Sequence, residues 1–163
     1  MNHLLSIITF LPLVGAVIIL LLARSGASET VARNARWIAL IFTVADLILS
    51  IVLWAKFDGS SSAFQFVEHH AWLTGGISYH MGVDGISMLF IVLTGILMPF
   101  CILASWEFIE NRVAESMIAF LALETLMMGV FAALDLFLFY LFFEGGLIPM
   151  FLIIGVWGGK RRV

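Results

Sequence analysis

Hydrophobic residues in this chain are gathered into five long runs, separated by short polar segments. A helix needs about 20 apolar residues to cross the hydrocarbon core of a membrane, and each run is close to that length. We therefore predict five membrane-spanning helices, over residues 4–23, 37–55, 86–106, 116–134 and 136–157. Little more than Asp135 separates the last two runs, so we expect them to form a tight helical hairpin.

The longest polar segment, residues 57–85, carries a different pattern. Residues 64–67 and 77–81 each alternate in polarity, and they flank the turn sequence Thr74-Gly75-Gly76. Alternation on both sides of a glycine turn is typical of a β-hairpin. We predict a short hairpin here, lying on the membrane surface at the outer face.

Composition supports an all-α membrane protein. The 163 residues are 63% hydrophobic and 12% charged, with a mean hydropathy of +1.13, whereas soluble domains have about 45–50% apolar and about 25% charged residues. All of 1–163 is interpreted as a single transmembrane domain whose solvent is the lipid bilayer. A net charge of −3 without a long basic run excludes nucleic acid as a partner. Cys101 is expected to be an inert core thiol, and one cysteine excludes disulfides and a zinc site.

Basic residues predict the orientation of the chain. Cytoplasmic loops carry an excess of lysine and arginine. With five spans and an external amino terminus, only Lys56 lies outside, and the other seven basic residues lie inside: Arg24, Arg33, Arg36, Arg112, Lys160, Arg161 and Arg162. The amino terminus is therefore predicted to face outward.

Three acidic residues lie near the middle of predicted spans: Asp46, Glu124 and Glu144. A charge at the bilayer centre costs a few kcal/mol even on insertion scales, so such groups face a protein interior or a wet cavity. Each could instead be protonated and serve helix packing alone, an alternative that stays open for all three and most of all for Asp46.

Glu144 is the main candidate for proton transfer. Gly145 and Gly146 follow it and allow a neighbouring helix to come close. Pro149 has no N–H to give to the carbonyl of Gly145, and that carbonyl needs water or another polar group. Desolvation penalises the charged form of a lone carboxylate, whereas a nearby lysine favours it. A moving partner could therefore load and unload a proton here.

The remaining polar groups carry weaker signals. Asp84 and Asp135 precede predicted helices, where capping explains both residues. Asp135 and Glu124 are kept as secondary candidates for proton transfer. His69 and His70 beside Glu68 are too few ligands for a metal site in an exposed loop, so we predict neither a metal nor a cofactor in this chain.

A family resemblance rests on two motifs and covers the whole chain. Residues 135–150, DLFLFYLFFEGGLIPM, followed by 153–159, IIGVWGG, resemble the fifth helix of subunit M, the subunit-4 type, antiporter-like chain of NADH:quinone oxidoreductase (respiratory complex I). Residues 81–87, MGVDGIS, resemble the start of that family's third helix, and residues 64–76 resemble its outer-face loop.

The resemblance implies a proton-translocating subunit with fourteen helices, of which this chain is the amino-terminal portion. Glu144 matches the family's key glutamate, which works with a lysine on the seventh helix. NADH oxidation and quinone reduction, with FMN and iron–sulfur clusters, are expected in partner subunits. The expected partners are other membrane subunits of complex I, including neighbouring antiporter-like chains. A bacterial plasma membrane is favoured over the mitochondrial inner membrane.

Two alternatives to this function remain open. One is a subunit of a related cation/proton antiporter or of a membrane-bound hydrogenase. The other is a structural membrane module whose acids only pack helices.

Overall fold

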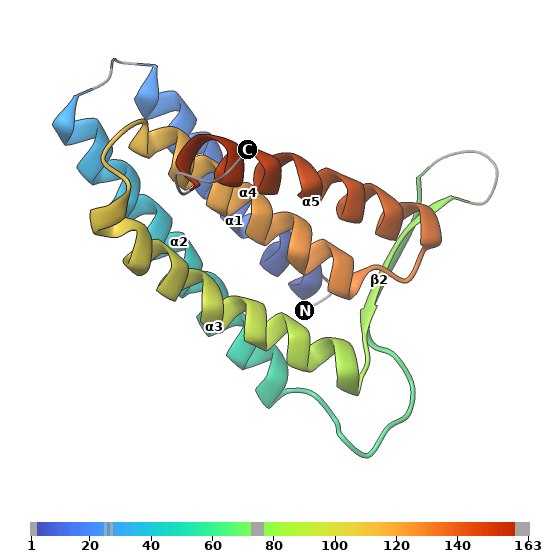
Figure 1. The fold of residues 1–163 in the computed structure, drawn as a ribbon. Coiled ribbons are helices and arrows are strands. Elements are labelled where there is room, and N and C mark those ends of the chain that lie inside the picture. The colour runs from blue at the N-terminus through green and yellow to red at the C-terminus, as the bar shows by residue number, and fades with distance from the viewer. Residues whose placement is uncertain (1–2, 25, 27, 73–76, 159–163) are drawn as a thin grey trace.

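The computed structural model describes residues 3–24, 26, 28–72 and 77–158. Five helices alternate in direction, and a two-stranded sheet connects the second to the third (Figure 1). In chain order the elements are α1 Leu4–Ala23, α2 Glu29–Ala55, β1 Gln65–Ala71, β2 Ser78–Val83, α3 Gly85–Phe108, α4 Val113–Ala132 and α5 Leu136–Trp157. The predicted all-α fold with a small hairpin is confirmed.

All five helices of the described chain are long and apolar enough to span a membrane. The bounds of α1 and α5 agree with the predicted runs, and those of α3 and α4 differ by one to three residues. The prediction for α2 was wrong by eight residues, because the helix begins at Glu29 rather than at residue 37. Ser28 caps α2 by accepting a hydrogen bond from the Val31 N–H at 3.2 Å. The charged first turns therefore stay helical beyond the apolar stretch.

Helix α4 occupies the centre of the bundle and packs against the other four helices. Two apolar clusters fill the interior, one toward each end. The cluster nearer the sheet includes Leu5, Ile8, Leu53, Ile91 and Met128. The cluster at the opposite end includes Ile19, Ala39, Ile102, Met117 and Leu121. We call these two ends of the bundle the hairpin end and the arginine end, since the latter carries Arg24, Arg33, Arg36 and Arg112.

The β-hairpin pairs antiparallel, with His69 opposite His80. A bulge between Gln65 and Glu68 interrupts the pairing, and Phe66 there has a positive φ of 54°. The predicted turn, Thr74 to Gly76, lies outside the described residues. On its other edge β2 meets the α4–α5 connection, where the Leu134 N–H donates to the His80 carbonyl at 2.8 Å. The hairpin thereby ties the loop between α2 and α3 to the start of α5.

Both predicted aspartate caps are confirmed. Asp84 accepts hydrogen bonds from the N–H groups of Ile86 and Ser87, at 3.1 and 2.7 Å, at the start of α3. Asp135 accepts from Phe137 and Leu138, at 2.9 and 3.2 Å, at the start of α5. These bonds satisfy backbone donors that have no partner within a helix.

Two predictions about single residues were wrong. Cys101 is exposed on the surface of α3 rather than buried in the core. An unbroken apolar run does not reveal which face of a helix packs inward, so the thiol could not be placed. Glu68, expected in an exposed loop, is only 4% exposed. It reaches from β1 to the start of α1, where it accepts from the N–H groups of Leu5 and Ser6 at 2.9 and 3.2 Å.

Candidate functional site

A layer of polar side chains crosses the bundle between its two apolar clusters. The layer is drawn from three helices, and its members are all buried: Thr43, Asp46 and Ser50 of α2, Thr94 of α3, and Glu124 and Thr125 of α4. Among them, Asp46 and Glu124 are 0% exposed. Two of the three intramembrane acids found in the sequence are thus core residues.

Asp46 and Glu124 are both buried, on α2 and α4, two helices that pack against one another. Neither carboxyl has a hydrogen-bond partner among the described residues. The same holds for the hydroxyls of Ser50 and Thr125. The sequence predicted that both acids lie within membrane spans, but it did not predict that the helices carrying them are in contact.

Glu144 has a different environment. It lies on α5, whose buried residues are Leu138, Phe142 and Pro149, and its own side chain is exposed at the surface of the bundle. Helix α5 packs mainly on α4. As expected from the sequence, glycine next to Glu144 permits this approach, because a Cβ on Gly145 would lie 3.0 Å from Leu126 of α4.

The three acids lie at a similar height in the bundle. Measured from the hairpin end, Asp46 is nine residues before the last residue of α2, Ala55. Glu124 is eight residues before Ala132, the last residue of α4, and Glu144 is eight residues after Leu136, the first of α5. At 1.5 Å per residue these offsets are about 12–14 Å. The acids therefore lie at similar distances along their helices from the hairpin end, and α4, which carries Glu124, packs against both α2 and α5.

The carboxylate of Asp135, a secondary candidate for proton transfer, accepts hydrogen bonds from the start of α5 and from β2. Hydrogen bonds to its carboxyl, first of all from the Leu138 N–H, hold its pKa below the usual range. Ser78 of β2 also donates to it from its backbone N–H, at 3.3 Å. The carboxylate is therefore charged at neutral pH, and capping of α5 and contact with β2 account for it.

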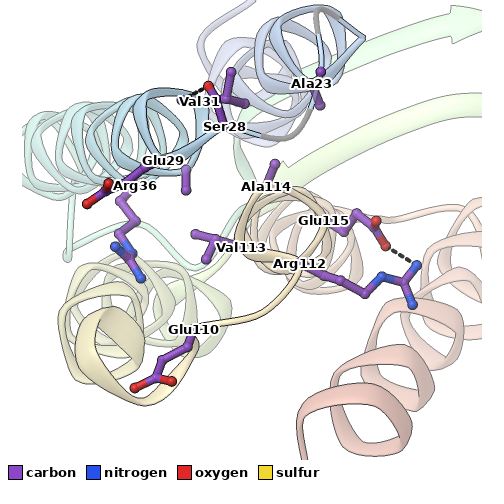
Figure 2. A pocket seen from close by; sticks show the side chains of 12 residues that line it. Ala23, Ser28, Glu29, Val31, Arg36, Glu110, Arg112, Val113, Ala114 and Glu115 are labelled. Atoms are coloured by element: carbon purple, nitrogen blue, oxygen red, sulfur yellow. Dashed lines mark hydrogen bonds and ion pairs between the residues drawn. The ribbon is translucent and has the colours of Figure 1, made fainter.

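A pocket at the arginine end lies apart from the three acids. It is formed by the end of α1, the start of α2 and the α3–α4 connection (Figure 2). Two of its lining residues are arginines that already have partners. Arg36 donates to the Ile109 carbonyl at 2.8 Å, and Arg112 forms an ion pair with Glu115. Both arginines of the lining therefore have at least one protein partner, although the Nε of Arg36 has none among the described residues.

The histidines of the hairpin do not gather into a metal site. His69 packs edge-on against His80, and His70 stacks on His3. Glu68 turns away to α1. In the described part of the chain, no three His, Cys, Asp or Glu side chains are grouped as metal ligands.

Fold and site together define a polytopic membrane protein that carries ionisable groups inside its spans. The chain belongs to the family described as NADH-ubiquinone oxidoreductase chain 4, amino terminus, whose sequence model matches residues 17–134. This match includes Asp46 and Glu124 and ends before Asp135 and Glu144.

Individual relatives extend the similarity across α5. The chain is 56% identical over 163 residues to NADH-quinone oxidoreductase subunit M of Rhodobacter capsulatus, covering 100% of this chain and 31% of that protein. It is 45% identical over 152 residues to NADH-ubiquinone oxidoreductase chain 4 of Arabidopsis thaliana, covering 93% and 30% respectively. With subunit M of Rickettsia conorii the identity is 42% over 159 residues, covering 97% and 32%. The chain thus spans about a third of the length of these relatives.

Proposed function

We propose that this chain is the amino-terminal portion of an antiporter-like subunit of NADH-quinone oxidoreductase and takes part in its proton translocation. Membership of the chain 4 family and similarity to proteins named subunit M support this assignment. The five helices would form the first part of a fourteen-helix unit. Redox chemistry, with FMN and iron–sulfur clusters, would take place in other subunits.

The position of Glu144 is the observation that carries the proposal. This carboxyl lies on the open face of α5, at mid-height, among exposed apolar side chains that include Tyr140 (57% exposed), Ile148 (66%) and Phe151 (75%). An ionisable group that faced lipid there would cost a few kcal/mol, so such groups face protein or a wet cavity. The face of α5 around Glu144 is therefore the surface that further helices of the same subunit would cover.

In this proposal Glu144 binds and releases the transported proton. The family resemblance supplies a lysine on the seventh helix as its charge partner. A lysine close by favours the carboxylate, and withdrawal of the lysine favours the protonated form. Movement of one charge would therefore drive a proton on or off Glu144, which couples transport to electrostatic changes elsewhere in the complex.

The proposed setting follows from the same assignment. Neighbouring membrane subunits of the complex, including other antiporter-like chains, would be the partners. The excess of arginine at one end of the bundle supports an amino terminus on the outer face. Similarity to subunit M of Rhodobacter capsulatus favours a bacterial plasma membrane.

Replacement of Glu144 in the complete subunit tests the proposal. Vesicles with the assembled complex carrying Glu144→Gln would be compared with parental vesicles for NADH-driven quinone reduction and for acidification of the interior. We expect both to fall at least tenfold at equal assembly. Glu115→Gln is the matched control, because this exposed carboxylate at the arginine end only pairs with Arg112. Full pumping by the Glu144 variant would assign the carboxyl to packing and reject proton transfer.

A further inference from the structure

One side of α2 is exposed from the arginine end to the hairpin end of the bundle. Its members recur every three or four residues and are all large and apolar: Trp37, Ile41, Val44, Ile48, Ile51 and Trp54. Residues at this spacing line one side of a helix. Each of them is 38–59% exposed, so this side, which we call the α2 stripe, faces outward from the described bundle.

A tryptophan stands at each end of the α2 stripe. Trp37 and Trp54 lie 17 positions apart in the chain, which corresponds to about 26 Å at about 1.5 Å per residue. The hydrocarbon core of a bilayer is about 30 Å thick, and tryptophan is enriched at both of its interfaces with water. The spacing therefore indicates a surface in contact with lipid, with Trp37 at the interface of the arginine end.

A groove between α2 and α3 lies beside Trp37. The two helices run side by side (Figure 1). The groove has a volume of about 370 Å³, within the range of about 300–1,000 Å³ that is usual for ligand pockets. Its lining is largely apolar: Trp37 and Leu40 of α2, and Leu103, Ala104, Trp106, Glu107 and Phe108 of α3. This lining, next to a surface in contact with lipid, suits a hydrocarbon chain. We call it the α2–α3 groove.

One wall of the α2–α3 groove is preformed. The Trp106 ring lies edge-on to Trp37, with the two ring centroids 5.4 Å apart. On the other side, the guanidinium of Arg36 lies 6.0 Å from the centroid of the Trp106 ring and donates to the Ile109 carbonyl at 2.8 Å. Edge-on aromatic contacts and cation–π contacts are both attractive. The Trp106 indole is therefore held by two neighbours before any ligand binds.

One charge of each sign lies at the polar rim of the α2–α3 groove. Arg33 precedes Trp37 by four residues, so it lies on the same side of α2, one turn nearer to the start of the helix. Glu107 adjoins Trp106 and lines the groove itself. Both side chains are exposed, and neither has a hydrogen bond or an ion pair among the described residues. The rim thus offers one cation and one anion to a ligand.

A phospholipid with a zwitterionic headgroup matches both the lining and the rim. Its phosphate accepts hydrogen bonds from arginine, and its ammonium group donates to a carboxylate. We propose that the α2–α3 groove binds one phosphatidylethanolamine molecule of the leaflet at the arginine end, with an acyl chain in the groove. The phosphate binds Arg33 and the amine binds Glu107. This site is separate from the function proposed for Glu144 and does not depend on it.

Photo-crosslinking in membranes that contain the complete complex tests the proposal. Leu103→p-benzoylphenylalanine puts a photoreactive group in the groove, and Leu93→p-benzoylphenylalanine is the matched control. Leu103 and Leu93 are 50% and 46% exposed on the same helix, and Leu93 does not line the groove. Mass spectrometry of the α3 peptides identifies the lipid bound at each position. We expect phosphatidylethanolamine to be enriched at least threefold at the Leu103 position over the Leu93 position, where the adducts should follow the composition of the bulk membrane.

Two charge variants separate a headgroup site from general contact with lipid. With the photoreactive group at the Leu103 position, Arg33→Gln should remove most of the enrichment, because the phosphate loses its donor. Glu107→Gln should lower the share of phosphatidylethanolamine and raise that of phosphatidylglycerol, since no carboxylate then repels an anionic headgroup. Arg24→Gln is the matched control, because it removes an exposed cation of the same end that does not line the groove. Equal adducts at the two photoreactive positions, or an enrichment that either Arg33→Gln or Glu107→Gln leaves unchanged, would overturn the proposal.

Other occupants of the groove give different results in the same experiment. Enrichment of phosphatidylglycerol or cardiolipin at the Leu103 position, with both rim charges present, would overturn the choice of an aminophospholipid. An adduct with a peptide at that position would show that a protein segment covers the groove, and it would overturn lipid binding.

A measurement without a photoreactive residue protects the test against failed incorporation. Phosphatidylethanolamine that stays with the purified complex after detergent washing would be counted at equal assembly. Trp37→Ala should lose bound phosphatidylethanolamine, because it removes an aromatic wall of the groove. Trp54→Ala changes the same residue type at the other end of the α2 stripe and should keep the parental amount. Equal retention in the two variants would overturn the proposal.

Discussion

Removal of the Glu68 carboxylate should loosen the first turn of α1. This side chain reaches from β1 across 62 or 63 positions of sequence and accepts from the N–H groups of Leu5 and Ser6. Its other oxygen accepts from the Ser6 hydroxyl and lies 3.8 Å from Nδ1 of His3. Because α1 has no side-chain cap from its own N-cap residue, Glu68 acts as the acceptor for this helix start.

The expected size follows from these contacts. A hydrogen bond to a charged group contributes about 1.5–3 kcal/mol, and an anion at a helix start adds about 0.3–1 kcal/mol. Water can enter at the hairpin end and replace some of the lost hydrogen bonds. Glu68→Ala should therefore lower the free energy of opening the first turn of α1 by about 3 kcal/mol. Since about 1.4 kcal/mol corresponds to a factor of ten, amides at the start of α1 should exchange roughly a hundredfold faster.

Hydrogen–deuterium exchange of the complete complex, read on peptides from the start of α1, measures this change. Ser6→Ala is the matched control, because it removes the hydroxyl contacts with Glu68 and Tyr79 and leaves both backbone bonds to Glu68. That variant should have a much smaller effect, about 1 kcal/mol. Unchanged exchange in Glu68→Ala, or an equal change in Ser6→Ala, would refute the assignment of Glu68 as the cap.

Two further predictions concern α5. A Cβ on Gly129 of α4 would overlap the ring of Phe142, so Gly129→Ala should destabilise the α4–α5 contact by about 1–3 kcal/mol. Adding Phe142→Leu to this variant should restore the stability. Thermal dissociation of the assembled complex measures both effects, and failure of the second change to restore stability would contradict the contact. Hydrogen bonds to Asp135 lower its pKa in the folded protein, so they stabilise the start of α5 at any pH above the ordinary aspartate pKa of about 3.9. This stabilisation is lost as the pH falls through the lower pKa of the folded state. Exchange at the start of α5 should therefore rise at acidic pH in the parent but not in Asp135→Asn, which keeps a capping oxygen; equal pH dependence in both would exclude this carboxyl as the cause.

The helices could be predicted because a membrane requires every span to satisfy its own backbone. Apolar length then locates each helix, as it did for α5, whose start is marked by Asp135 and whose end by Gly158. The start of α2 was missed because its first turns carry charge and lie beyond the apolar stretch. Ser28, followed at once by Glu29, was the available signal for that start.

The partnerships between helices could not be predicted in the same way. A helix that is apolar all round has no distinct face, so the pattern does not say that Asp46 and Glu124 are buried while Glu144 is exposed. The reach of Glu68 to α1 depends on the fold of the whole hairpin. Alternation along β1 predicts which side chains share a face of the strand. It does not predict which other element packs against that face.

Helix α5 is held by hydrogen bonds near both of its ends. At its start, the Leu134 N–H donates to the His80 carbonyl and the Ser78 N–H donates to the Asp135 carboxylate. At its end, the indole N–H of Trp157 donates to the Asn111 carbonyl at 2.9 Å. Between these points, Gly129 and Gly145 seat it closely on α4. These contacts hold the backbone of α5, which carries Glu144, in a fixed position relative to α4. Any change in the charge of that carboxyl has to be brought by groups that come and go beside it, or by rotation of the side chain itself.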